Sequence, residues 1–176
     1  FLVEEHAIKN FLLKFFDRQK AQAIAEIFEK AEYRMRAWLW GELILMLIIG
    51  IVTFIGLSLL GIPYALPLAL IAGLLEAVPI IGPIIAALPA ILIVSSQSSI
   101  LILAIVALYF IIQQLENQIV VPFIMKKAVG LNPIVTLAAL IIGGKLAGFL
   151  GIFLAIPIML FLETILVEAA QMRSQS

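Results

Sequence analysis

The chain is 176 residues long, and 64% of its residues are hydrophobic whereas only 12% are charged. Its mean hydropathy of +1.22 lies far above the range of soluble globular domains. Eleven basic and eleven acidic residues give a net charge of zero, and there is no basic tract to suit a nucleic acid. The sequence has no cysteine and one histidine, His6, which excludes disulfides and thiolate metal sites and disfavours histidine-based catalysis. We therefore expect neither an enzyme nor a metal cofactor.

Residues 4–42 are the charged part of the chain, with seven of the eleven basic residues and seven acidic ones. Apolar residues recur among them at helical spacing, which predicts amphipathic helices with one covered face each. These apolar stripes are Ile8, Phe11, Leu12, Phe15 and Phe16, then Ile24, Ile27, Phe28, Ala31 and Met35. The concentration of Lys and Arg predicts a cytoplasmic segment that lies on the membrane or packs against a neighbour. Because residues 1–3 resemble the end of an apolar helix, we also expect an earlier membrane helix.

Residues 43–168 form a predicted transmembrane region, which begins just after Trp38 and Trp40 at the membrane interface and precedes a cytoplasmic tail at 169–176. The only charges between residues 43 and 167 are Glu76, Glu116, Lys126, Lys127, Lys145 and Glu163. The same stretch is rich in proline and glycine, which break helices. Broken helices survive at membrane depth only where they pack against protein or line a wet cavity, because hydrocarbon cannot satisfy freed backbone groups. This combination indicates a transporter.

Proline and glycine divide the first half of this region. Residues 43–60 are long enough to cross the membrane, whereas 65–78 and 84–94 are each too short to span it. Between these two short segments lie Pro79, Gly82 and Pro83, through which neither helix can continue. The two segments are therefore expected either as a re-entrant hairpin or as one long kinked helix.

The second half repeats this layout. A span at 100–121 carries a polar Glu116-Asn117-Gln118 group, and the short segment 134–142 is followed by glycines and by an apolar stretch at 149–167. Matching residues recur at an offset of 69, so we predict a two-fold repeat of residues 43–94 and 100–167. The expected helix breaks across both halves are Pro79, Gly82, Pro83, Pro122, Pro133, Gly144 and Gly151.

Polar residues inside the apolar region are the candidates for a substrate or ion pathway. A charge at membrane depth is costly, so such residues usually face a cavity and carry function. The candidate residues are Glu76, Gln114, Glu116, Asn117 and Lys145. Each has a plainer interpretation. Glu76 could lie near the membrane surface, the polar group around Glu116 could be an interhelical hydrogen-bond cluster, and Lys145 could pair with a carboxylate or cap a half-helix.

Three segments carry a resemblance to a known family. They are GIPYA at residues 61–65 with EAVPIIGPI at 76–84, then EN at 116–117 with VPFIMKKAVGLNP at 121–133, and GGKLAGFLG at 143–151 with AIP at 155–157. Together they resemble the autoinducer-2 exporter family of bacterial permeases, whose members are about twice this length. The resemblance implies a homo-oligomeric, multispanning inner-membrane protein with a cytoplasmic C-terminus. The chain departs from the family pattern at Glu76, where a neutral polar residue is more common, and at Asn132, where a histidine is.

The residues and the resemblance together predict an all-α polytopic membrane protein with broken or re-entrant helices. Its expected function is transport of a small polar solute, such as an autoinducer-2-like molecule of quorum sensing, with a proton or sodium ion as the coupling ion. Its expected partners are the lipid bilayer, the solute and further copies of the chain. The alternatives are a sodium/proton antiporter, as some relatives are described, and a passive channel.

Overall fold

The computed structural model describes residues 18–78, 81–125 and 133–174. Every regular element in these residues is helical, and three helical stretches are long and apolar enough to cross a membrane, which confirms the predicted all-α polytopic class. The three stretches are Ile24–Leu59, Ser99–Ile124 and Ile134–Glu168. The elements in chain order are α2 (Arg18–Leu59), α3 (Ala65–Leu75), α4 (Ile81–Val94), α5 (Ser99–Leu115), the π-helix η1 (Glu116–Val120), α6 (Val121–Ile124) and α7 (Pro133–Ser174).

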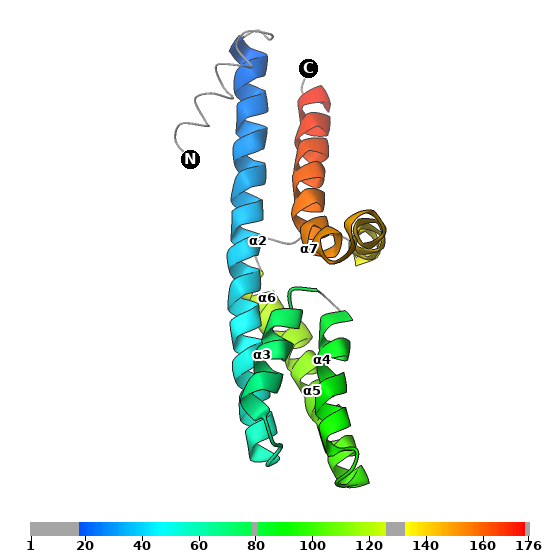
Figure 1. Cartoon of the computed structure of the whole chain (residues 1–176). Coiled ribbons are helices and arrows are strands. Elements are labelled where there is room, and N and C mark those ends of the chain that lie inside the picture. The colour runs from blue at the N-terminus through cyan, green and yellow to red at the C-terminus, as the bar shows by residue number, and fades with distance from the viewer. Residues whose placement is uncertain (1–17, 79–80, 126–132, 175–176) are drawn as a thin grey trace.

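Helix α2 is the central helix of the structure, because α3, α5, α6 and α7 all contact it (Figure 1). Its 42 residues contain no proline and would measure about 63 Å, roughly twice the hydrocarbon thickness of a bilayer. The charged residues from Arg18 onward therefore continue the axis of the first span without a break. This part of α2 contacts α7. Ile27 and Ala31 are buried in it, whereas Phe28 is 36% exposed and its ring lies 5.6 Å from that of Phe161, centroid to centroid. Phe11 and Phe15 lie outside the described residues.

Helices α3 and α4 form a re-entrant hairpin. They have 11 and 14 residues, which corresponds to about 17 and 21 Å, too short to cross a core of about 30 Å. In Figure 1 the start of α3 and the end of α4 lie at the same end of the molecule. Of the two architectures that fitted the sequence, the re-entrant hairpin is the one found here.

The chain reverses sharply at the tip of this hairpin. A side chain on Gly82 would come within 1.8 Å of the carbonyl oxygen of Leu75, so only a glycine fits this contact between the end of α3 and the start of α4. Pro83 lies in the first turn of α4, where a missing N–H leaves no helical hydrogen bond unmade. Pro79 lies outside the described residues.

Helix α7 is broken in its first half. Ala147 and Gly148 leave helical geometry, and Gly148 adopts φ 59° and ψ −135°, a conformation that glycine alone adopts without strain. On either side of this kink the backbone approaches itself, because a side chain on Gly151 would lie 1.9 Å from the carbonyl oxygen of Gly143. The break therefore falls at Ala147–Gly148. Gly144 and Gly151 flank the turn, and neither forms it.

Pro122 does not end its helix, contrary to the sequence prediction. Helices α5, η1 and α6 follow one another without a gap, and the turn before Pro122 widens into a π-helix in which Val121 N–H bonds to the carbonyl oxygen of Glu116. A widened turn of this kind relieves the clash of a proline ring with the preceding turn, so the helix bulges instead of stopping. Pro133 is the first residue of α7.

Candidate functional site: three buried carboxylates at the hairpin tip

Three glutamates from separate elements are buried where the hairpin tip meets α2 and η1. Glu42 lies in α2, Glu76 follows α3 and Glu116 opens η1, and their exposed fractions are 3%, 3% and 7%. The charge of Glu116 acts on both other carboxylates, and that of Glu42 acts on Glu76. Three like charges in an apolar interior would be very costly, so the site calls for bound protons or a bound cation.

Glu76 is held by the end of α3. Its backbone N–H bonds to the carbonyl oxygen of Ala72 at 3.1 Å, and Ala77 and Val78 close the last turn on Leu74 and Leu75. The carbonyl end of a helix carries partial negative charge, which repels a carboxylate and attracts a cation or a proton. The hairpin thus places Glu76 at the helix end that stabilises its ionised form least.

Glu116 owes its position to the π-helix. Glu116 is buried, whereas its neighbours Asn117 and Gln118 on the same wide turn are exposed. One turn earlier, Gln113 donates a hydrogen bond from Nε2 to Glu116 Oε2. Single π turns are frequent at functional sites, and this one separates one inward carboxylate from its outward neighbours.

The carboxyl groups of Glu76 and Glu116 lie close enough to form a hydrogen bond with each other. Two carboxylates have only acceptors, so such a bond requires that one of the two groups holds a proton. The pair is therefore a proton-sharing unit in an interior that is otherwise mostly hydrocarbon. Removing its proton would leave two negative charges within hydrogen-bond distance, next to Glu42.

Glu42 belongs to the site, although the sequence analysis counted it with the charged segment at 4–42. Its Oε1 is buried and has no hydrogen-bond partner in the part of the chain that the structure describes. The packing around it is tight, because a side chain on the adjacent Gly41 would lie 2.9 Å from the sulfur of Met125. The available signal was the position of Glu42 directly before an unbroken apolar run. A charge there must either reach the surface or find a partner inside.

Of the predicted pathway residues, the structure brings together Glu76 and Glu116. Gln114 and Asn117 are exposed on the outer face of their helix, and Lys145 is exposed on α7 just before the kink. Lys145 takes part in none of the ion pairs found among the described residues, so it neutralises neither Glu76 nor Glu116 there. Lys126 and Lys127 lie outside the described residues.

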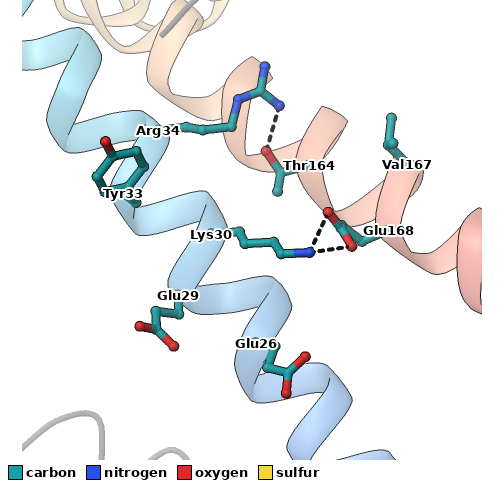
Figure 2. A pocket seen from close by; sticks show the side chains of 8 residues that line it. All are labelled: Glu26, Glu29, Lys30, Tyr33, Arg34, Thr164, Val167 and Glu168. Carbon is teal, nitrogen blue, oxygen red and sulfur yellow. Dashed lines mark hydrogen bonds and ion pairs between the residues drawn. The ribbon is translucent and has the colours of Figure 1, made fainter. Parts of the chain in front are cut away.

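A second polar region joins the charged part of α2 to the end of α7 (Figure 2). Lys30 Nζ pairs with Glu168 at 2.9 Å, and Arg34 bonds to Glu163 Oε2 and Thr164 Oγ1, both at 2.9 Å. Lys30, Arg34, Thr164 and Glu168 line a cleft of about 540 Å³. Ion pairs exposed to this degree each contribute little to stability. Their main effect is to hold the charged part of α2 next to the end of α7.

No group of three or more His, Cys, Asp or Glu side chains in the described ranges is arranged to hold a metal ion. The three glutamates are close enough to interact electrostatically but do not converge on one point as metal ligands do. The chemistry that this arrangement supports directly is the binding and release of a proton at the Glu76–Glu116 pair.

Comparison with known proteins places the chain in a family. A family model described as AI-2E family transporter matches residues 1–171. "Putative transport protein YrrI" of Bacillus subtilis (strain 168) is 37% identical over 77% of the chain and 38% of its own length. "Putative permease PerM" of Escherichia coli (strain K12) is 27% identical over 94% of the chain and 47% of its own length. The chain thus spans less than half the length of these relatives. On this evidence it belongs to the AI-2E family of membrane transporters.

Proposed function

We propose that this chain forms the proton-carrying part of a transporter that moves a small polar solute, such as an autoinducer-2-like signalling molecule, in exchange for a proton. The observation that supports this most is the close approach of two buried carboxyls, because that of Glu76 comes from the tip of a re-entrant hairpin and that of Glu116 from a π-helix. Broken helices that meet in the interior are where transporters bind their substrates and coupling ions.

Proton loss would act mechanically on the hairpin. Two unit charges about 3 Å apart at an effective dielectric constant of about 20 repel by roughly 5 kcal/mol. This energy is enough to shift a two-state equilibrium almost completely from one side to the other. The tip that carries Glu76 would move away from η1 when the pair loses its proton, and it would return when a proton rebinds. Movement of a half-helix around a midplane site is a physical means of alternating access.

The surroundings of the site are consistent with a bacterial inner membrane. We assign the charged part of α2 and the C-terminal tail to the cytoplasm by the positive-inside rule. Large apolar side chains are exposed along all three spans, for example Leu47 at 64%, Leu103 at 70% and Leu146 at 82%. Lipid, the remaining part of the full-length protein and further copies of the chain would cover this surface.

Sodium coupling and passive conduction are the alternatives. A carboxylate pair can bind a sodium ion as well as a proton, which would suit a sodium/proton antiporter. A passive channel would need no coupling residue. Three buried glutamates would then carry a cost without a function, so this alternative is the least favoured.

The test uses the full-length transporter in proteoliposomes, with labelled autoinducer-2 as the probe. Glu76→Gln and Glu116→Gln each remove one charge with little change in volume. We expect both variants to lose the acceleration of flux by an imposed pH gradient. Glu163→Gln, the same substitution at the ion pair with Arg34, is the matched control and should keep it. Unchanged pH dependence in folded Glu76→Gln and Glu116→Gln would contradict proton coupling, and dependence on a sodium gradient alone would favour the antiporter.

A further inference from the structure

A cavity of about 10 Å³ lies against Glu76, on the side of α2 and α5. Its polar lining residues are Thr53, Glu76, Tyr109 and Gln113, and the rest of the lining is apolar. A space of this size admits a single water molecule, provided that two or more polar groups receive it. The cavity thus meets the volume requirement for one water at a site that contains a carboxyl of the proton-sharing pair.

Thr53 provides the second observation. Its side chain is fully buried, and its Oγ1 has no hydrogen-bond partner among the described residues. A threonine in mid-helix usually donates its hydroxyl to the carbonyl four residues earlier, as Thr164 does to Leu160 at 2.7 Å. Thr53 makes no such bond. A buried hydroxyl without a hydrogen-bond partner is destabilising and rare. The Thr53 hydroxyl at the cavity therefore needs a partner other than the described residues.

Tyr109 and Gln113, which also line the cavity, have oxygen atoms that can accept a hydrogen bond from the partner of Thr53. The Tyr109 hydroxyl donates to the carbonyl oxygen of Ala86 at 3.2 Å, and the Gln113 amide donates to Glu116. Each of these two side chains therefore keeps an oxygen acceptor with unused capacity. A water molecule can donate one hydrogen bond to such an acceptor and its other one to Glu76, while it accepts the hydrogen bond of the Thr53 hydroxyl.

We propose that Thr53 positions one water molecule in this cavity, where the water donates a hydrogen bond to Glu76 and stabilises its ionised form. Thr53 is a positioning residue, since it acts on Glu76 through the water. Within the described ranges, the titratable groups that face Glu76 are Glu42 from α2, Glu116 from η1 and Tyr109 from α5, and none of them bears a positive charge. The water is then the group that lowers the cost of an ionised Glu76. The proposal deepens the proposed proton coupling and uses the same carboxyl pair.

Thr53→Val tests the proposal because it replaces the hydroxyl by a methyl group of similar size. The full-length protein is purified in detergent and its thermal unfolding is measured. If the hydroxyl holds a water that serves Glu76, Thr53→Val lowers the unfolding temperature and Thr53→Ser restores it. If the hydroxyl is an unpartnered group, the valine removes a buried polar atom and raises the unfolding temperature, which would overturn the proposal.

A second readout follows the carboxyl itself and needs no transport activity. Infrared difference spectra across a pH series report the C=O band of the protonated acid, which is assigned to Glu76 by its loss in Glu76→Gln. We expect Thr53→Val to keep this band to a pH about one unit higher than wild type, because the ionised form has lost a hydrogen bond. Thr53→Ser and the control Thr164→Val should leave it in place. An unmoved band in Thr53→Val would contradict the proposal.

A third measurement on wild type covers the case in which Thr53→Val does not fold. A bound water that responds to ionisation of Glu76 gives an O–H stretching band in the difference spectrum. We expect this band to shift in frequency in water labelled with oxygen-18 and to be absent from the spectrum of Glu76→Gln. A wild-type spectrum without such a signal would overturn the proposal. Stabilisation of wild type, but not of Glu76→Gln, by sodium chloride over choline chloride would identify the occupant as a cation and also refute the proposal. These outcomes are independent of whether flux depends on pH, so the proposed function can fail separately.

Discussion

Gly82→Ala tests whether the tight hairpin tip positions Glu76. A methyl group at this position would lie 1.8 Å from the carbonyl oxygen of Leu75, whereas real contacts of this kind stay beyond 3.0 Å. The two backbones must therefore separate by about 1.2 Å, and the moving carbonyl belongs to the residue directly before Glu76. Overpacking of this kind costs about 1–3 kcal/mol. The higher helix propensity of alanine offsets this destabilisation by no more than about 1 kcal/mol.

The displacement also reaches the carboxyl pair. The oxygen–oxygen distance in a hydrogen bond varies over a range of only about 0.5 Å. A shift of more than about 1 Å at the tip would therefore break a hydrogen bond between Glu76 and Glu116. We expect Gly82→Ala to unfold about 1–2 kcal/mol more easily than wild type in mixed detergent micelles, and to lose pH-dependent flux.

The matched control is Gly144→Ala, a helical glycine whose nearest neighbours are the flexible side-chain atoms of Ile152 at 3.2 and 3.4 Å. This substitution should be neutral or stabilising, by no more than about 1 kcal/mol. The reasoning would be refuted if Gly82→Ala were as stable as Gly144→Ala and its infrared spectrum still showed the band of the protonated carboxyl. Neither the close contact at the tip nor its role in positioning Glu76 would then hold.

Two further variants test the carboxylates and the kink. Glu42→Gln removes a buried charge that acts on Glu76 and Glu116, so it should stabilise the protein by about 1 kcal/mol at alkaline pH and have little effect in acid, where the wild-type carboxyls are protonated. A pH-independent effect in unfolding titrations would argue that Glu42 is not coupled to the pair. Gly148→Ala forces an alanine into φ 59° and ψ −135°, which should cost about 1–3 kcal/mol. An alanine variant at least as stable as wild type would show that α7 is straight at this point.

Sequence reasoning located the broken hairpins because proline and glycine act locally. Gly82 and Pro83 lie in the first turn of α4, where the proline needs no N–H and the glycine allows close contact with the end of α3. The glycines around residue 148 let the two parts of α7 approach closely, so the short helices follow from chain stereochemistry. The same reasoning identified Glu76 and Glu116, since a lone carboxylate in an apolar run must be buried with a partner or exposed to water.

The members of the site that were missed depend on rotation about helix axes. Gln114 lies two residues before Glu116 and about 200° away from it around the helix, whereas Gln113 lies about 60° away. Gln113 therefore faces the carboxylate and Gln114 faces outward. The π-helix changes this rotation again at Asn117, and periodicity alone does not reveal a π turn. Glu42 and Thr53 became recognisable only when the packing of α2 against the hairpin placed them beside Glu76 and Glu116.

The unbroken length of α2 has a mechanical consequence. One half of this helix contacts the α3–α4 hairpin through α3, and the other half is fastened to α7 by the ion pairs of Lys30 and Arg34. A rigid rod of about 63 Å that tilts by about 5° around its middle displaces each end by about 3 Å in opposite directions. Glu42 lies near the fulcrum of such a lever and would hardly move. The two broken elements would swing against each other at opposite ends of the molecule, so opening at one side would be geometrically tied to closing at the other.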